Sequence, residues 1–261
     1  MAAALGNPIR YRNLKSELYN VMTPPVHLNS RHAGATKTWH GSDTEHFFKK
    51  NTQDPAKLAY LEQMGWSDPT AINYKFNSHG FRCDEFRETD NFIAIGCSYT
   101  QGIGLPLELT WPALLAQKVG LTPYNLGIGG TGADTCFRLL DYYLPLLKPR
   151  FIVFLCPPEA RVEILLNGEA DVFLPESMST RYNPNDFYLS NWFAHTDNYK
   201  NNRRKNILAC KYLAHQHNTK ILVSLVDEWP IPIEVGFARD FLHSGPVAQE
   251  LFVEKTLGML S

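Results

Sequence analysis

The stretch "NFIAIGCSYTQGIG", from Asn91 to Gly104, decides the fold of this chain. Its apolar run, residues 92–95, stops abruptly at "GCS", which ends on Ser98, and further small residues and glycines follow. A short apolar run bounded by such turn residues predicts a buried strand that leads into a helix. Ligands of open α/β sheets bind beyond the carboxyl ends of the strands, so this turn can present Ser98 to a substrate. The alternative is that glycine and serine are simply usual in such turns.

Strand and helix patterns alternate from this stretch to the end of the chain. Three further apolar segments are predicted strands: residues 123–126, 151–155 and 220–226. Four predicted helices connect and follow these strands. The first covers residues 113–119 behind the N-cap Thr110, and the second begins at Asp134 or Thr135 and starts to terminate at Pro145. The third covers residues 206–215, and the last begins at Pro246. This order indicates an α/β fold with a parallel sheet covered on both faces.

Residues 1–88 differ from the remainder because they are rich in Asn, His, Lys and Thr and show few apolar patterns. We expect an irregular N-terminal extension that wraps the core and has little core of its own, followed by one α/β domain over residues 89–261. Short helices are predicted within the extension at residues 45–50 and 55–64.

A long interval between Cys156 and Asn202 is rich in Pro, Asn, Ser and aromatic residues. A loop of that length in a compact domain is either functional or a surface excursion that packs its own aromatics. If it is functional, the aromatic residues between Phe187 and Tyr199 are candidates for the wall of a specificity pocket.

The composition argues against several classes of partner. The 261 residues carry a formal net charge of −1 and no long run of Lys or Arg, which argues against a nucleic-acid or anionic membrane surface. No apolar run approaches the ~18 residues that a membrane helix needs, and the N-terminus lacks the apolar segment of a signal peptide. Five scattered cysteines without CxxC spacing are typical of reduced, packed thiols. We therefore expect a cytoplasmic protein that binds neither nucleic acid nor membrane.

Asp240 and His243 are the candidate partners of Ser98. A serine is a poor nucleophile by itself, because it needs a base and the base needs a group that orients it. The stretch "RDFLHSGP" places Asp240 three residues before His243, just ahead of the predicted last helix. An acid at that spacing can fold back onto the imidazole and fix its tautomer, as the third member of a triad must.

Two other patterns do not point to a cofactor. His40, Asp43, Glu45 and His46 could hold a metal, but their spacing matches no established ligand pattern. The segment "GIGGTGA", residues 127–133, lacks Gly-x-Gly-x-x-Gly spacing, and no acidic residue follows at the distance that a dinucleotide site requires. We expect neither a metal nor a nucleotide cofactor.

Several motifs together resemble the SGNH (GDSL-type) family of serine esterases and acyl hydrolases. "GCSYTQGIG" resembles the first block of that family, Gly-Asp-Ser-x-Thr-x-Gly, with Ser98 at the serine. "NLGIGGTGADT" resembles the second block, in which Gly130 is the best match for the oxyanion glycine. "DFLHSGP" resembles the fifth block, Asp-x-x-His, at Asp240 and His243. "YKFNSHGFRCDEF" and "LTWPALLAQKV" resemble segments that flank the nucleophile strand in many bacterial members, so the similarity runs from about residue 74 to the C-terminus.

The resemblance implies a flavodoxin-like, three-layer α/β/α fold with a catalytic triad. Ser98 would be the nucleophile, His243 the base and Asp240 the group that orients it. The N–H groups of Ser98 and Gly130 would form the oxyanion hole. The resemblance implies no cofactor and no metal.

Two positions depart from the family pattern. The aspartate of the first block is Cys97 here, and its apolar neighbours favour a packed thiol over the alternative in which Cys97 is the nucleophile. The third block, Gly-x-Asn-Asp, should follow the third strand, but "FLCPPEARVE" has no asparagine. Loss of an oxyanion donor typically costs ~10²–10³ in rate unless another group replaces it. Arg161 is the nearest strong donor, and the alternative is that it pairs with Glu159 or Glu163 on the surface.

These observations predict an ester hydrolase that removes acetyl or other short acyl groups from a carbohydrate or a small molecule. We expect weak activity if no group replaces the missing asparagine. The alternative is a catalytically silent SGNH-like module that binds a glycan or a protein. The presence of all three candidate residues, Ser98, Asp240 and His243, argues against this alternative. Acyl transfer to an acceptor other than water is a third hypothesis and stays open beside hydrolysis.

Overall fold

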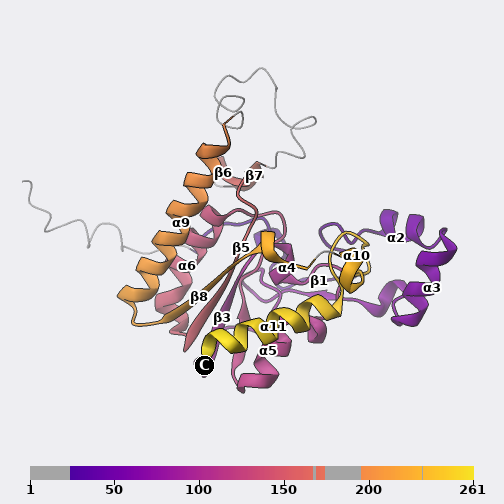
Figure 1. Cartoon of the computed structure of the whole chain (residues 1–261), viewed down its shortest axis with the longest axis horizontal. Coiled ribbons are helices and arrows are strands. Elements are labelled where there is room, and N and C mark those ends of the chain that lie inside the picture. Colours follow the sequence, from indigo (N-terminus) through magenta and orange to yellow (C-terminus); the bar gives the residue numbers. More distant parts are fainter. Residues whose placement is uncertain (1–23, 167–168, 174–194, 231) are drawn as a thin grey trace, which may run out of the picture.

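A four-stranded sheet lies at the centre of the molecule (Figure 1). The computed structural model describes residues 24–166, 169–173, 195–230 and 232–261. The strands run in the order β4 (Thr122–Asn125), β3 (Asn91–Gly96), β5 (Phe151–Cys156) and β8 (Lys220–Leu225). Each adjacent pair is parallel, and all residues of the two central strands are buried. The four predicted strands therefore form one parallel sheet whose centre is covered on both faces.

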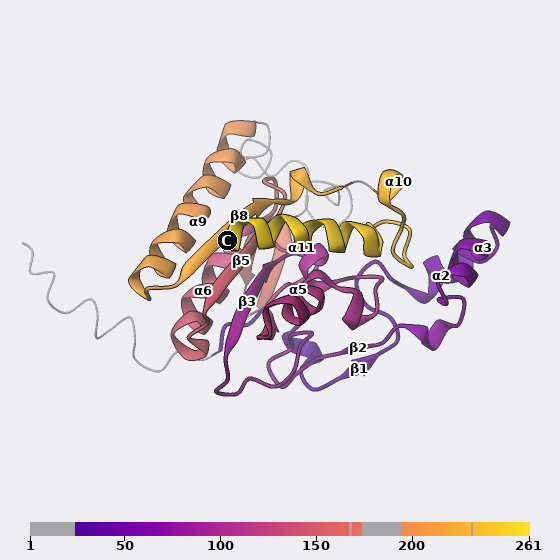
Figure 2. The same cartoon turned by 60° about the horizontal axis from the view of Figure 1, so that its bottom comes forward.

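Helices cover both faces of the sheet, as Figures 1 and 2 show. One pair packs on each face: α6 (Ala133–Leu147) with α9 (Thr196–Gln216), and α5 (Trp111–Val119) with α11 (Pro246–Leu260). Successive side chains of a strand point to opposite faces, so Ile93 and Ile95 join the first core cluster whereas Phe92 and Ala94 join the second. The predicted three-layer α/β/α fold is confirmed.

Two helices differ from their predicted bounds. Helix α6 continues past Pro145 to Leu147. Lys148 follows in the left-handed conformation, with a φ of 45°, and ends the helix. Helix α9 begins at Thr196, well before the predicted start at Asn206. Its first turns consist of polar residues, so no apolar period marks them in the sequence.

The interval after β5 contains a β-hairpin where the sequence predicted a long loop. Strands β6 (Val162–Leu166) and β7 (Glu169–Phe173) pair antiparallel, and the hairpin packs near α6. Charged residues interrupt both strands, Glu163 in β6 and Glu169 and Asp171 in β7, so neither shows a continuous apolar run. The aromatic candidates Phe187, Tyr188, Trp192 and Phe193 lie outside the described residues, whereas His195 and Tyr199 lie at the start of α9.

The described part of the N-terminal extension is built from short elements. They are η1 (Ser30–His32), β1 (Thr36–Lys37), α2 (Glu45–Asn51), α3 (Pro55–Gln63), η2 (Pro69–Ala71) and β2 (Tyr74–Lys75). Helices α2 and α3 confirm the two predicted helices, and β1 pairs antiparallel with β2. Both helices lie at one end of the molecule in the two views (Figures 1 and 2).

The extension buries more apolar surface than its composition suggested. A third core cluster draws mainly on its side chains: Phe48, Leu61, Trp66, Ile72, Tyr74 and Phe76. Three residues from elsewhere complete that cluster, namely Ile103 and Leu105 after β3 and Ala238 before α11. The extension is thus packed against the two loops that carry the candidate site residues, and the domain boundary at residue 88 stays a prediction.

Short helical segments complete the described fold: α4 (Ser98–Gln101), η3 (Leu107–Leu109), η5 (Val226–Glu228) and α10 (Pro232–Val235). Among the helices of the described ranges, none combines the length and the apolar character that a bilayer span requires.

Candidate active site

The chain makes a tight turn at the carboxyl end of β3, where Ser98 opens the short helix α4. Gly96 is required in this turn because a Cβ atom there would overlap the hydroxyl group of Thr100. Cys97 is fully buried and packs in the core cluster on the α5 and α11 face, as a packed thiol does. Ser98 keeps 7% of its surface exposed, so the serine and not the cysteine is presented outside the core.

Ser98, His243 and Asp240 form one hydrogen-bonded chain. Nε2 of His243 lies 2.8 Å from Oγ of Ser98, and Nδ1 lies 2.6 Å from Oδ2 of Asp240. The other carboxylate oxygen, Oδ1, accepts the backbone N–H groups of Leu242 and His243 at 3.0 and 3.1 Å. A carboxylate at Nδ1 favours the tautomer with the proton on that nitrogen, which leaves Nε2 free to accept from the serine.

The surroundings of Asp240 keep its carboxyl group ionised. Burial by itself would raise the pKa of Asp240, but the hydrogen bond and charge of His243 and a hydrogen bond from Ser42 outweigh it, so this pKa lies below its usual value. The ring of Tyr99 packs edge-on against the His243 imidazole, with centroids 5.0 Å apart. The imidazole is therefore held both by the carboxylate and by an aromatic ring.

The glycine loop after β4, residues 127–130, is hydrogen-bonded to helix α4, which begins at Ser98. Oε1 of Gln101 accepts the N–H of Gly129 at 2.8 Å. The Asn125 side chain bridges the two segments, because its oxygen accepts a loop N–H at 2.9 Å and its nitrogen donates to the Thr100 carbonyl oxygen at 2.8 Å. These bonds fix the distance between the loop and Ser98.

The backbone N–H groups of Ser98 and Gly130 are candidate donors to an anion. A Cβ atom at Gly129 would lie 3.7 Å from Cβ of Ser98, which places the glycine loop against the serine. Gly130 has a φ of +84°, a left-handed conformation that favours glycine. Within the described ranges, neither the N–H of Ser98 nor that of Gly130 donates a hydrogen bond. Free donors are what the stabilisation of an oxyanion requires.

Arg161 does not form the ion pair that the sequence offered as an alternative. Glu163 pairs instead with Arg138 at 2.5 Å, and Glu159 pairs with Arg203 at 2.8 Å. Nε and Nη1 of Arg161 are buried, and among the described residues they have no hydrogen-bond partner. A buried polar atom without a partner is costly, so these two nitrogens are candidate donors to a bound group.

The backbone of Arg161 contacts Gly132, which lies just after the glycine loop. A Cβ atom at Gly132 would overlap the carbonyl oxygen of Arg161, so the two backbones touch. Burial raises the pKa of Tyr99, and the positive charge of Arg161 acts in the opposite direction. Tyr99 itself contacts the ring of His243.

Two buried arginines support the site and were not predicted as functional. Arg82 donates to the backbone carbonyl oxygens of Gly102 and Leu105 at 2.5 and 2.8 Å, just after the nucleophile helix. Arg239 pairs with Asp43 and directly precedes Asp240. Arg82 lies in the segment "YKFNSHGFRCDEF", whose resemblance to a flanking segment of the family was a sequence signal for it. No local signal marked the second, since its partner lies 196 residues away.

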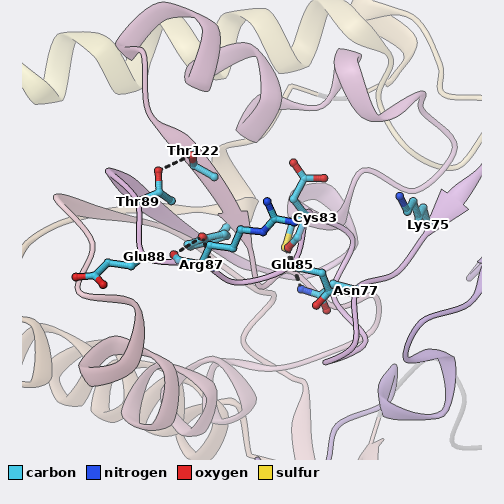
Figure 3. Close-up of a pocket in the computed structure, with 10 residues that line it drawn as sticks. Lys75, Asn77, Cys83, Glu85, Arg87, Glu88, Thr89 and Thr122 are labelled. Atoms are coloured by element: carbon cyan, nitrogen blue, oxygen red, sulfur yellow. Dashed lines mark hydrogen bonds between the residues drawn. The ribbon is translucent and has the colours of Figure 1, made fainter.

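Large cavities lie elsewhere on the described surface. Figure 3 shows one of about 520 Å³, lined by polar and charged side chains that include Lys75, Arg87, Glu88, Thr89 and Thr122. Thr89 and Thr122 precede or begin β3 and β4, so this cavity lies at the amino ends of the strands. It contains none of the predicted site residues, which lie beyond the carboxyl ends, where such sheets bind ligands.

Residues that were weighed as metal ligands have other roles. Asp43 pairs with Arg239, and Glu45 pairs with Lys49 one helical turn away. His40 is a neighbour of Gln101, at 3.1 Å between their Nε2 atoms. In the part of the chain that the structure describes, no group of three or more His, Cys, Asp or Glu side chains is arranged to hold a metal.

Known proteins resemble this chain in structure. No model of a protein family matches it, and no curated protein matches it significantly. Three similar solved structures are a protein described as a lipolytic member of the G-D-S-L family from Desulfitobacterium hafniense, the psychrotrophic esterase EstA from Pseudoalteromonas sp., and a family 3 carbohydrate esterase from Clostridium thermocellum. They are 14, 15 and 14% identical to this chain, with TM-scores of 0.34, 0.35 and 0.34. The matches cover 64, 66 and 66% of this chain and 97, 97 and 98% of theirs.

The motifs of this chain resemble those of the SGNH (GDSL-type) hydrolases. At these identities and TM-scores the structural matches carry no argument about activity, so the chemistry follows from the residues of this chain itself.

Proposed function

We propose that this protein is a serine-dependent ester hydrolase that works through an acyl-enzyme. The observation that carries the proposal is the hydrogen-bonded chain from Ser98 Oγ through the His243 ring to Asp240. A hydroxyl, an imidazole and a carboxylate in this order are used by serine hydrolases on several unrelated folds. The serine also stands at the carboxyl end of a strand, where open α/β sheets bind their ligands.

In the proposed reaction, Oγ of Ser98 attacks the ester carbonyl carbon while Nε2 of His243 takes the hydroxyl proton. The bond between the acyl carbon and the alcohol oxygen then breaks, and His243 gives the proton to the departing alcohol. A water molecule attacks the acyl-enzyme with the help of the same base, which releases the carboxylic acid and restores Ser98. Asp240 stays ionised and stabilises the imidazolium, in keeping with the lowered pKa of its carboxyl group.

Three donors would stabilise the negative oxygen of the tetrahedral intermediate. The N–H groups of Ser98 and Gly130 border the nucleophile and donate to no acceptor in the described ranges. We assign the third donor to Arg161, in place of the asparagine that the third block of the SGNH family supplies. Its buried Nε and Nη1 atoms, which have no hydrogen-bond partner among the described residues, support this assignment, since a charged donor in a site shielded from water stabilises an oxyanion strongly.

The space around the nucleophile favours a short acyl group such as acetyl. Ser98 is 7% exposed, and the His243 side chain is 14% exposed. The ring of Tyr99 contacts those of His243 and Trp229, with centroids 5.0 and 5.4 Å away. The low exposure of the serine and the aromatic ring beside the imidazole support a small acyl group, while the alcohol part, from a carbohydrate or a small molecule, stays outside.

The complete triad supports an enzyme over a catalytically silent binding module. A module that only binds has no need of an ionised, buried Asp240 hydrogen-bonded to His243, because burying a carboxylate is costly. Acyl transfer uses the same acyl-enzyme and differs only in the acceptor.

Hydrolysis of p-nitrophenyl acetate by the full chain tests the proposal. We expect steady release of p-nitrophenolate, which the Ser98→Ala variant loses. Ser78→Ala is the matched control, because the exposed side chain of this serine bonds to Glu85 and to no other residue in the described ranges, so its loss should leave the rate unchanged. Equal rates for the wild-type protein and Ser98→Ala would overturn the proposal. Adding a short alcohol and looking for the new ester separates transfer from hydrolysis.

A further inference from the structure

We propose that the turn at residues 40–43 of the N-terminal extension is part of the active-site architecture, in which Ser42 is a positioning residue for Asp240. This inference rests on the proposed function. It concerns a part of the chain, before residue 74, that the family resemblance does not cover.

Ser42 completes the hydrogen bonding of the triad carboxylate. Its Oγ donates to Oδ2 of Asp240 at 2.7 Å, the same oxygen that lies 2.6 Å from Nδ1 of His243. Oδ1 already accepts two backbone N–H groups, so both carboxylate oxygens are held and the carboxylate plane is fixed. Asp240 is 3% exposed, and solvent is therefore a poor substitute for the serine donor.

The geometry of the turn explains how Ser42 reaches the triad. Two backbone hydrogen bonds between His40 and Asp43, at 3.0 and 3.1 Å, close the turn. Gly41 has a φ of +62°, which favours glycine, and a Cβ atom there would come within 3.1 Å of Cδ1 of Ile103. The turn therefore packs against the segment that follows helix α4, and Ser42 comes within hydrogen-bond distance of Asp240.

A buried ion pair fastens the same turn to the neighbour of Asp240. Nε of Arg239 lies 3.0 Å from Oδ1 of Asp43, and Nη2 lies 2.6 Å from Oδ2, with both side chains shielded from solvent. The Tyr74 hydroxyl donates to Asp43 at 2.6 Å and accepts the N–H of Gly104 at 2.8 Å. The turn is therefore tied to the loop of the base and to the segment after the nucleophile.

Helix α3 holds the other side of the Asp-x-x-His turn. The Tyr60 hydroxyl donates to the carbonyl oxygen of Phe237 at 2.7 Å and accepts its N–H at 3.0 Å. The Tyr60 ring packs against Phe241, with centroids 5.6 Å apart. Phe241 lies between Asp240 and His243 with a φ of +56°, a costly conformation for a bulky residue that persists only where its surroundings enforce it. The extension supplies those surroundings.

The test compares Ser42→Ala, Ser42→Thr and Thr44→Ala in the full chain with p-nitrophenyl acetate as substrate. We expect kcat of Ser42→Ala to fall about tenfold with KM unchanged, the size of effect of one hydrogen bond to a charged group. Ser42→Thr keeps the hydroxyl and should restore most of the rate. Thr44 lies in the same segment but only caps α2 by accepting the N–H of Phe47, so Thr44→Ala should keep the wild-type kcat.

A second readout does not depend on activity. The downfield NMR signal of the proton on Nδ1 of His243 reports its hydrogen bond to Asp240, and we expect it to broaden or disappear in Ser42→Ala but not in Thr44→Ala. If Ser42→Ala does not fold, Ser42→Cys replaces it, because a thiol of similar size is a weak donor.

The outcomes separate this inference from the proposed function. An active wild-type protein with an unchanged kcat and NMR signal in Ser42→Ala would overturn the inference and leave the enzyme in place. An equal loss in Thr44→Ala would also overturn it, since the effect would then be one of general stability. An inactive wild-type protein would remove the proposed function, and the NMR comparison would still decide whether Ser42 positions the carboxylate.

Discussion

The two halves of the candidate site are supported in different ways. The nucleophile half is local: Gly96 permits the turn, and Ser98 follows directly on a central strand of the sheet. The base half lies on a loop before α11, and the N-terminal extension holds it through Ser42 and Tyr60, 198 and 177 residues away from their partners. A short motif can therefore reveal the nucleophile, whereas the geometry of the base depends on contacts that no motif records.

The two buried arginines show the same contrast. Arg82 supports the nucleophile half by donating, among the described residues, to backbone carbonyl oxygens such as that of Gly102, and burial lowers its pKa to about 10. Arg239 supports the base half through the carboxylate of Asp43. The base half is thus more sensitive to the loss of a single partner, because that loss leaves a buried charge uncompensated.

The largest expected effect comes from removing the imidazole of His243, which joins the two halves of the candidate site. His243→Ala should lower kcat for p-nitrophenyl acetate by about 10³-fold or more, because Ser98 loses its base. Stopped-flow and steady-state assays measure the loss. His217→Ala, at the exposed end of α9, is the control that should retain the wild-type rate. A His243→Ala variant with more than a tenth of the wild-type kcat would contradict the assignment.

Asp43→Ala should break the support of the base half. It leaves Arg239 buried without its carboxylate, and we expect a loss of about 3–5 kcal/mol in the free energy of unfolding. Urea denaturation measures this loss. Glu45→Ala removes an exposed ion pair with Lys49 in the same extension and should cost under about 0.5 kcal/mol. Equal losses in the two variants would show that the buried pair does not support the loop.

Arg161→Met tests the third donor. If the guanidinium stabilises the oxyanion, kcat should fall by roughly 10²-fold while KM changes little, because the interaction is made in the transition state. Arg150→Met is the control, since Arg150 forms an exposed pair with Asp90 at the far end of β5. A change in KM alone would instead assign Arg161 to substrate binding.

The smallest expected effect is a pH dependence of stability. The pKa of Asp240 is lower in the folded chain than in the unfolded one, so its ionised form stabilises the fold above the ordinary carboxyl pKa of about 4. This contribution is lost as the pH falls through the lower folded pKa. The stability difference between the wild-type protein and Asp240→Asn, measured by urea denaturation, should therefore shrink between about pH 5 and pH 2. A difference that stays constant over this range would contradict the assigned direction.

Much of the fold could be predicted because its signals are local. The apolar segments that became β3 and β5 and the apolar stripe of α6 need no distant partner to be recognised. The hairpin β6–β7 was missed because charged residues interrupt both strands, so neither is a continuous apolar run. The early start of α9 was missed because its first turns are polar.

The candidate site could be predicted only as far as its motifs reach. Ser98, Asp240 and His243 stand in recognisable patterns, whereas Ser42 lies in a segment whose acids and histidines suggested only a weak metal pattern. Among the described residues, Arg161 is left without a partner because the neighbouring acidic side chains pair with other arginines. Arg138 on α6 forms two hydrogen bonds with Glu163 on β6, and this pairing requires that the hairpin has formed.

Covalent labelling with a fluorophosphonate tests most directly the central claim that a distant histidine activates Ser98. Intact mass spectrometry of the wild-type chain should show one added phosphonyl group, and peptide mapping should place it on Ser98. The Ser98→Ala variant should stay unlabelled, and His243→Ala should be labelled far more slowly. A wild-type chain that remains unmodified, or a label on another residue, would contradict the account.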